Sequence, residues 1–119
     1  MNNLIGRLVG CTFLGMKGLK EGSIEVIIRT DRGSLRFHHH QNCCERVSLQ
    51  DFEGGILPGG LIHIAQERTG ETEWDDFGRT RWTFYTIQST SGDLDLRFIG
   101  KDNGYYSTSV DLEWRPVKD

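Results

Sequence analysis

Residues 28–37 are Ile28-Arg29-Thr30-Asp31-Arg32-Gly33-Ser34-Leu35-Arg36-Phe37. Apolar and polar side chains alternate on both sides of Asp31-Arg32-Gly33, which is the pattern of two half-buried strands. The three central residues predict a tight hairpin turn in which glycine supplies a positive φ angle. The side chains expected to point toward the core of this hairpin, counted from the strand that leads into it, are Ile24, Val26, Ile28, Leu35 and Phe37.

The same alternation predicts strands along most of the chain. The further segments that show it are Leu8–Leu14, Val47–Phe52, Leu61–Glu67, Arg81–Ser89, Asp93–Ile99 and Val110–Arg115. No helical periodicity competes with it, so we expect a mostly β fold of about eight short, mainly antiparallel strands. These strands would form a twisted sheet, a sandwich or a partly open barrel in a single domain over residues 1–119. The polar, acidic segment Arg68–Arg79 is expected to be an exposed loop.

A pseudo-repeat is visible between residues 28–37 and Ile87-Gln88-Ser89-Thr90-Ser91-Gly92-Asp93-Leu94-Asp95-Leu96. The two segments share an isoleucine, a hydroxyl residue, a glycine, a leucine and a large apolar residue in ungapped register. Each is followed by a polar loop and a Val-x-Leu strand, Val47-Ser48-Leu49 or Val110-Asp111-Leu112. A repeated hairpin-loop-strand unit would place the loops 38–45 and 100–107 in equivalent positions, facing a common groove. The alternative is that two half-buried hairpins look alike because alternation and a turn glycine are generic.

Composition restricts the classes of function. The formal net charge of −3 argues against nonspecific nucleic-acid binding, which needs a basic surface. No stretch approaches the roughly 20 apolar residues of a membrane span, and the N-terminus lacks the pattern of a signal peptide. Three cysteines, an odd number, favour reduced thiols in a cytosol. The expected setting is therefore cytoplasmic, with no membrane partner.

The least ordinary stretch is His38-His39-His40-Gln41-Asn42-Cys43-Cys44-Glu45. Imidazole and thiolate suit zinc, and a metal site would use His38, His40, Cys43 and Cys44. The spacing fits such a site badly, because adjacent cysteines differ from the Cys-x-x-Cys of structural zinc sites and no second ligand pair exists. A nucleophilic cysteine with a histidine partner is a further alternative, which residue types alone do not establish. No cofactor is therefore expected, with zinc as the alternative, and an enzyme is less favoured than a binding protein.

Recognition is the broadest interpretation of this loop. His39, His40 and Gln41 offer donors to phosphate, carboxylate or partner backbone groups. Cys43 and Cys44 can simply pack as small hydrophobic side chains beneath them. The loop can both bind a ligand through its polar residues and pack its two cysteines against the core.

A second polar loop contains Asn103-Gly104-Tyr105-Tyr106-Ser107. Asn-Gly is a strong turn signal. Because adjacent residues of an extended chain point in opposite directions, one of Tyr105 and Tyr106 is expected in the core, and the other would be free to stack on a base or ring. Arg97, on the polar face of the preceding strand, would supply positive charge to an anionic ligand. The alternative is a hairpin whose tyrosines only close the end of the sheet.

Together, residues 39–45, Val47-Ser48-Leu49, residues 103–107 and Val110-Asp111-Leu112 resemble a family of small uncharacterised proteins found mainly in bacteriophages and prophages. That family shows His-His-Gln-Asp-Cys-Cys-Glu, then a Val-x-Ile/Leu strand, then Ser-Asn-Gly-Tyr-Tyr-Ser. The resemblance spans about Leu4 to Leu112, and this chain departs from it with Asn42 and Asp102. It implies a phage-encoded accessory protein that acts in the cytoplasm of a bacterial host.

Three hypotheses follow. The first is a non-enzymatic binding protein for a small anionic or nucleotide-like molecule or a host protein surface, with a counter-defence role such as sequestering a nucleotide-like signal. Its ligand-binding residues would be His39, His40, Gln41, Arg97, Asn103, Tyr105 and Tyr106. The second is a zinc-like metal site in the His/Cys loop. The third is a structural or homo-oligomeric phage component that pairs through open sheet edges.

Overall fold

The fold was analysed in a computed structural model, which describes residues 4–39, 45–76, 78–102 and 110–117. These residues form one short 3₁₀ helix and eight strands. The elements are η1 (Leu4–Leu8), β1 (Phe13–Lys17), β2 (Glu25–Thr30), β3 (Gly33–His38), β4 (Glu45–Gly54), β5 (Ile62–Asp75), β6 (Gly78–Ser89), β7 (Gly92–Asp102) and β8 (Asp111–Pro116). No α-helix occurs in the described ranges, so the mostly β prediction is confirmed.

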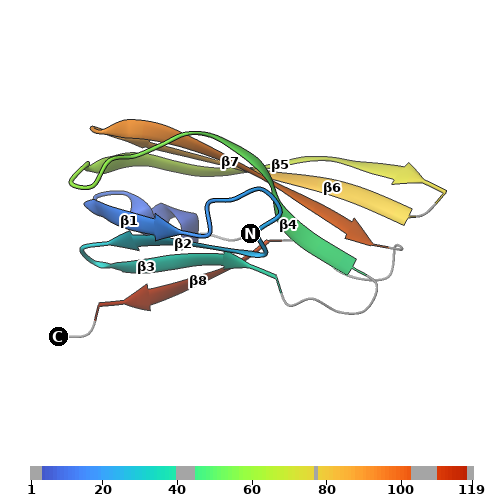
Figure 1. The fold of residues 1–119 in the computed structure, drawn as a ribbon, viewed down its shortest axis with the longest axis horizontal. Coiled ribbons are helices and arrows are strands. Elements are labelled where there is room, and N and C mark those ends of the chain that lie inside the picture. The colour runs from blue at the N-terminus through green and yellow to red at the C-terminus, as the bar shows by residue number, and fades with distance from the viewer. Residues whose placement is uncertain (1–3, 40–44, 77, 103–109, 118–119) are drawn as a thin grey trace.

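The strands form two four-stranded antiparallel sheets, with the orders β1-β2-β3-β8 and β4-β7-β6-β5. Figure 1 shows them as two stacked layers, so the chain is an open sandwich and not a closed barrel. We call them the short sheet and the long sheet, because β5 and β6 of the second sheet continue past the end of the first (Figure 1).

The core lies between the two sheets and follows the predicted alternation. In β3 and β7, every second residue is buried from Gly33 to Phe37 and from Leu94 to Asp102. Phe37 of the short sheet packs against Tyr85 and Phe98 of the long sheet, with ring centroids 4.9 and 6.0 Å apart. Tyr85 and Phe98 contact each other edge to face at 5.8 Å, so three rings from three strands form one cluster.

The predicted repeat is present in the topology. The short sheet has the order β1-β2-β3-β8, and the long sheet read from its other edge has the order β5-β6-β7-β4. The strands β1, β2 and β3 thus correspond to β5, β6 and β7, and β8 corresponds to β4. The hairpin turns also match, because the Thr30 hydroxyl donates to the Gly33 carbonyl and the Ser89 hydroxyl donates to the Gly92 carbonyl, each at 2.7 Å. Two hairpins that agree in topology and in turn hydrogen bonds are unlike a chance match of alternation.

The two halves meet at a bridge between Thr12 and Leu61. The Asp31 amide donates to the Thr12 carbonyl at 3.1 Å, and the Thr90 amide donates to the Leu61 carbonyl at 3.0 Å. A side-chain oxygen of Asp31 accepts from the Thr12 amide at 2.8 Å, just as the Thr90 hydroxyl accepts from the Leu61 amide at 2.9 Å. These paired bonds give the sandwich an approximate two-fold relation.

The last strand of each unit is exchanged between the sheets. β4 follows the first hairpin but pairs with β7, and β8 follows the second hairpin but pairs with β3. The predicted match of the two Val-x-Leu segments is out of register. Leu112 lies opposite Phe37, whereas Phe52, and not Leu49, lies opposite Leu96, the residue that corresponds to Phe37.

One detail of the first turn differs from its prediction. Gly33 does not have a positive φ angle, although its counterpart Gly92 has a φ of 136°. Glycine is needed at position 33 for space, because a Cβ atom there would lie 2.6 Å from the Arg115 carbonyl oxygen and 2.7 Å from the Trp114 ring. The close approach of β8 therefore requires a glycine at position 33, and the conformation of the turn does not.

The largest difference from the sequence-based expectation is the segment Arg68–Arg79. Residues 68–75 form the second half of β5, and Gly78 and Arg79 start β6, with Thr72 opposite Arg81 and Trp74 opposite Arg79. Its acidic residues suggested a loop, but they alternate with Thr72 and Trp74, both of which favour strands. Burial no longer alternates here, since Glu71–Asp75 are all exposed, which fits a hairpin that extends beyond the other sheet.

The N-terminal segment also differs. Leu8 ends the 3₁₀ helix, and the first strand begins at Phe13 in place of Leu8. Ile24 precedes β2 and is 50% exposed, so it does not share the buried face of Val26 and Ile28. Within the described part of the chain, no helix has the length and apolar character needed to cross a membrane.

Replacing Phe37 with alanine should lower the free energy of unfolding by about 3–5 kcal/mol, because the cavity would lie between the two sheets. Urea denaturation at neutral pH measures this loss. Phe52→Ala is the matched control and should cost clearly less, since 39% of Phe52 is exposed. Equal losses for the two variants would contradict the central position of Phe37.

Candidate functional site

The two predicted loops start and finish side by side. His38, the last residue of β3, lies opposite Asp111, the first residue of β8. Glu45, the first residue of β4, lies opposite Asp102, the last residue of β7. Each loop therefore leaves one sheet and enters the other at the same end of the sandwich. We call these four residues, His38, Glu45, Asp102 and Asp111, the loop anchors.

Most of the predicted site residues lie outside the described residues. These are His40, Gln41, Cys43, Cys44, Asn103, Tyr105 and Tyr106. Within the described ranges, no group of three or more His, Cys, Asp or Glu side chains could hold a metal ion. The zinc alternative needs His40, Cys43 and Cys44 in addition to His38, so it stays a prediction.

The two described histidines have different surroundings. His38 is partly exposed, with its Nε2 atom 3.9 Å from a carboxylate oxygen of Glu113. The His39 side chain is only 5% exposed, and its Nδ1 atom lies 3.5 Å from a carboxylate oxygen of Asp111. Burial beside Asp111 fixes the chain at the point where the first loop begins.

Tyr85 reaches the same end of the core from β6. Its side chain is fully buried, and its hydroxyl makes no hydrogen bond with any residue that the structure describes. Burial raises the pKa of Tyr85, and the nearby carboxylates of Glu67 and Asp111 raise it further. The hydroxyl is therefore a permanent neutral donor near the start of β8.

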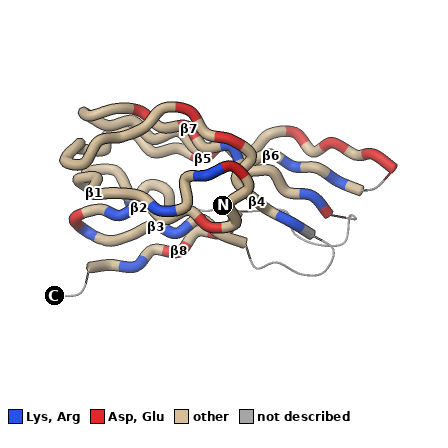
Figure 2. The backbone as a smooth tube through the Cα atoms, in the orientation of Figure 1, with Lys and Arg blue, Asp and Glu red and all other residues tan. Residues whose placement is uncertain are grey.

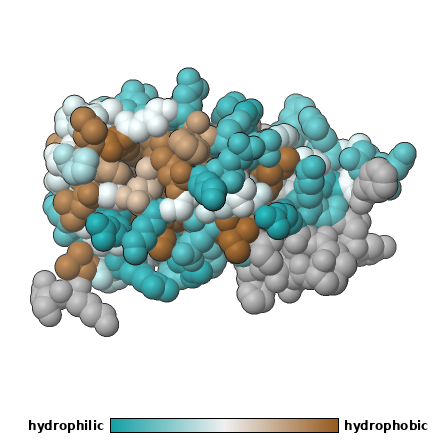
Figure 3. Space-filling model, viewed as in Figure 1, coloured by the Kyte–Doolittle hydropathy of each residue, from teal (hydrophilic) through white to brown (hydrophobic). Residues whose placement is uncertain are grey.

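Beyond Tyr85 the inner face of the long sheet is not covered by the short sheet, and we call this part the overhang. Pairing across β5, β6 and β7 places six residues on its inner face in two rows, Thr72–Arg81–Gly100 and Trp74–Arg79–Asp102. The second row ends at Asp102, which is one of the loop anchors. In Figure 3 the coloured residues at this end of the molecule are mostly hydrophilic, whereas hydrophobic residues gather over the two-sheet part.

The row with Trp74 is fixed by a buried ion pair. Arg79 donates two hydrogen bonds to the carboxylate of Asp102, at 3.2 and 2.7 Å, and the Asp102 side chain is fully buried. The Arg79 guanidinium also lies 5.7 Å from the centre of the Trp74 ring. Trp74 is nevertheless 66% exposed, so much of its surface is available to another ring.

The row with Arg81 has a different character. Arg81 is partly buried between Thr72 and Gly100, and Gly100 contributes no side chain. Among the described residues, no carboxylate forms an ion pair with Arg81. A partly buried guanidinium with free donors attracts phosphate or carboxylate groups more strongly than a fully solvated one does.

Trp74, Arg79 and Arg81 were not among the residues that the sequence pointed to. The sequence signal for this face was an alternation with a period of two. Thr72 and Trp74 alternate with Glu71 and Glu73, and Arg79 and Arg81 follow at the same spacing. This signal was obscured by the acidic residues, which face away from this row.

Arg97 lies on the outer face of the long sheet, away from the loop anchors. It forms a two-pronged ion pair with Asp51 and packs 5.5 Å from the centre of the Trp82 ring. The hydrogen bond from Arg97 holds the pKa of Asp51 below its usual value. Asp102 lies on the opposite face and about 17 Å farther along β7, so we do not group Arg97 with the loop anchors.

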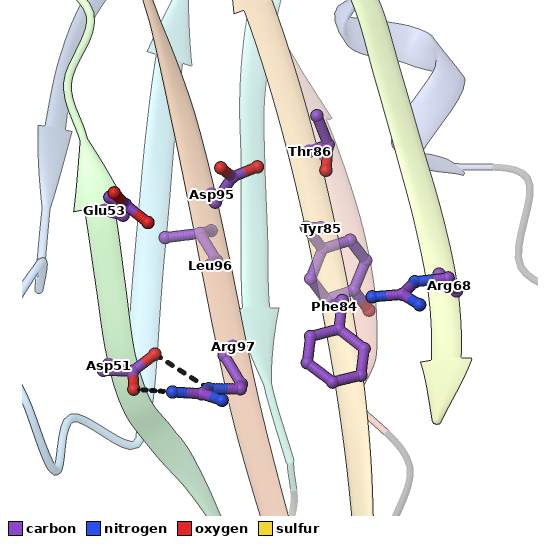
Figure 4. A pocket seen from close by; sticks show the side chains of 9 residues that line it. All are labelled: Asp51, Glu53, Arg68, Phe84, Tyr85, Thr86, Asp95, Leu96 and Arg97. Atoms are coloured by element: carbon purple, nitrogen blue, oxygen red, sulfur yellow. Dashed lines mark hydrogen bonds and ion pairs between the residues drawn. The ribbon is translucent and has the colours of Figure 1, made fainter. Parts of the chain in front are cut away.

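A pocket of about 360 Å³ surrounds Arg97 on this outer face (Figure 4). Arg68 stacks on Phe84 at 4.6 Å from the ring centre. Glu53 and Asp95, which face each other across β4 and β7, add a row of negative charge. Its lining mixes three carboxylates with two guanidinium groups, one of them already paired, so it offers little net attraction to an anion.

Two ion pairs of the same kind differ in burial and should differ in energy. Asp102→Ala leaves Arg79 without its buried carboxylate and should lower the free energy of unfolding by about 3–5 kcal/mol. Asp51→Ala removes a pair whose members are both almost half exposed and should cost no more than about 1 kcal/mol. Chemical denaturation compares the two variants, and similar losses would show that the overhang is not held by this buried pair.

Comparison with known proteins identifies a family and no activity. The model of a family described as a domain of unknown function, DUF7448, matches residues 2–112. Neither the curated proteins nor the solved structures contain a significant match. The family match covers β1 to β7 and the first two residues of β8, and the chain therefore belongs to the DUF7448 family.

Proposed function

We propose that this chain is a non-enzymatic binding protein that holds a small nucleotide-like anion against the inner face of the overhang. The observation that carries the proposal is the position of Trp74 and Arg81. An exposed aromatic ring and a guanidinium lie on the same face of the same hairpin, beside the anchors of both predicted loops.

The chemistry of the two rows suits a ligand with a flat ring and a negative group. Stacking of a base on an aromatic side chain contributes about 1–3 kcal/mol, and Trp74 provides that surface. Arg81 would donate charge-assisted hydrogen bonds to a phosphate or carboxylate. The side chains of Trp74 and Arg81 are on paired strands, one row apart, which is within the length of a nucleotide.

The pair of Arg79 and Asp102 prepares this surface before a ligand arrives. Because both hydrogen bonds and the contact with Trp74 are already made, little side-chain entropy remains to be lost on binding. Arg79 would thus act as a positioning residue for Trp74, with Arg81 as the cation that contacts the ligand.

The residues predicted from the loops complete the proposal. His40, Gln41, Asn103, Tyr105 and Tyr106 belong to the two segments whose anchors border the overhang. They would add hydrogen bonds and a second stacking surface around the ligand. His39, packed beside Asp111, would keep the first loop in place.

The resemblance to phage and prophage proteins supports a biological setting for this activity. A phage-encoded protein in the cytoplasm of a bacterial host would bind a nucleotide-like signal stoichiometrically and so remove it from a defence pathway. Blocking a host protein is the alternative use of the same surface. In that case a protein side chain or terminus would take the place of the anion on Arg81.

The test is isothermal titration calorimetry of tag-free protein with adenosine, guanosine, cytidine and uridine 5′-monophosphates. At least one nucleotide should bind, and Trp74→Ala and Arg81→Ala should each weaken its affinity about tenfold or more, which corresponds to about 1.4 kcal/mol. Arg68→Ala is the matched control, because it removes the same charge from the opposite face of the neighbouring strand.

Thermal unfolding of each variant confirms that it is folded. The proposal is wrong if no nucleotide binds, or if Arg68→Ala weakens binding as much as Arg81→Ala does. Binding that survives both Trp74→Ala and Arg81→Ala would place the ligand elsewhere on the molecule.

A further inference from the structure

We propose a second, separate binding site on the outer face of the short sheet, for an organic anion with an apolar body. The site is a hollow of about 360 Å³, which we call the basic hollow. Its side chains come from β1, β2, β3 and β8 and from the residue after β8. The ones that define its chemistry are Lys17, Ile27, Arg29, Arg36, Arg115 and Val117.

The charge of the basic hollow is of one sign. Four of its lining residues are cations, and its lining contains no carboxylate. The pocket around Arg97 on the other outer face contains three carboxylates, Asp51, Glu53 and Asp95. Figure 2 shows basic residues along the strands of the short sheet, with acidic residues among them. The linings of the two outer faces therefore differ in charge, although the strands beneath them are related by the pseudo-repeat.

Two of the four cations are held in place from outside the hollow. Arg36 donates to Glu25 at 2.5 Å and to Glu113 at 3.2 Å, and Arg115 donates to Glu113 at 2.6 Å. Those carboxylates orient the two guanidinium groups along one wall of the hollow. They also offset part of the positive charge, so the wall is ordered without being strongly repulsive.

The other two cations have no such partner. Within the described ranges, neither Lys17 nor Arg29 forms an ion pair. Gly15 makes room for Arg29, since a Cβ atom at Gly15 would lie 3.3 Å from a guanidinium nitrogen of Arg29. Arg29 therefore lies flat over β1 with its donors available, and Lys17 lies next to it on the same face.

The hollow also has an apolar component. Ile27 is partly buried on β2 between Arg36 and Lys17, and Pro116 and Val117 are exposed on the other side. Val117 is 54% exposed, which a bound apolar group would reduce. An ion such as free phosphate would use the cations alone. A phosphate or carboxylate joined to a flat hydrocarbon body would use both components, and this is the ligand class that we assign.

The experiment compares two probes by isothermal titration calorimetry, inorganic phosphate and 1-naphthyl phosphate. The naphthyl ester should bind at least tenfold more tightly than phosphate, because only the ester covers Ile27 and Val117. Arg29→Ala should weaken its binding about tenfold. Arg32→Ala is the matched control, since Arg32 lies in the exposed turn between β2 and β3 and does not line the hollow; it should change the affinity less than twofold.

Several results would contradict the proposal that the basic hollow binds an organic anion. They are no binding of 1-naphthyl phosphate at millimolar concentration, equal affinity for the two probes, or equal loss in Arg29→Ala and Arg32→Ala. Arg81→Ala separates this site from the overhang, because loss of naphthyl phosphate binding in that variant would place the probe on the overhang.

A second copy of the chain is the other occupant to be tested. Sedimentation velocity at high micromolar concentration measures it. A dimer that dissociates in Arg29→Ala, together with no probe binding, would replace the small-ligand proposal by a self-association surface. A monomer that binds the naphthyl ester supports the proposal as stated.

Discussion

The contact of Phe37 with Tyr85 and Phe98 is the constraint on which the rest of the sandwich depends. Among the residues that the structure describes, it is the aromatic contact that joins the two sheets, and each of its three rings comes from a central strand. Because Phe37 lies one residue before the end of β3, the short sheet stops just past this cluster. The long sheet continues, and its inner face beyond Tyr85 is not covered by the short sheet (Figure 1).

The approximate two-fold relation explains why two loops distant in sequence share one end of the molecule. Each hairpin is followed by a segment that crosses to the opposite sheet, so both crossings occur where β3 and β7 end. If β4 paired with β3 and β8 paired with β7, each loop would begin and end in the same sheet. The ends of the two loops would then not lie opposite one another. The exchange of these two strands thus brings the ends of both loops to one end of the sandwich.

The fold could be predicted from the sequence to a large extent, because a period of two is a direct consequence of burying one face of a strand. Leu94, Leu96 and Phe98 show it clearly, and all three are buried. The overhang could not be predicted in this way. Once a sheet has no partner, burial no longer alternates, and Thr72, Trp74 and Arg81 are strand residues without an apolar face. Arg97 shows a second limit, since alternation gives its face correctly but says nothing of Asp51, which lies 46 residues away.

The two proposed sites differ in how their cations are prepared. In the overhang, Arg79 is paired with the buried Asp102, and Arg81 would contact the ligand. In the basic hollow, partly exposed carboxylates orient Arg36 and Arg115. The three tryptophans of the chain lie in three different places: Trp74 on the overhang, Trp82 on the outer face of the long sheet, and Trp114 against the core on the inner face of the short sheet. The most direct measurement is therefore the set of tryptophan indole N–H signals in a ¹H–¹⁵N NMR spectrum during titration with a nucleotide. The account predicts that the Trp74 signal moves while those of Trp82 and Trp114 stay in place. Movement of Trp82 or Trp114 with a stationary Trp74 would contradict it.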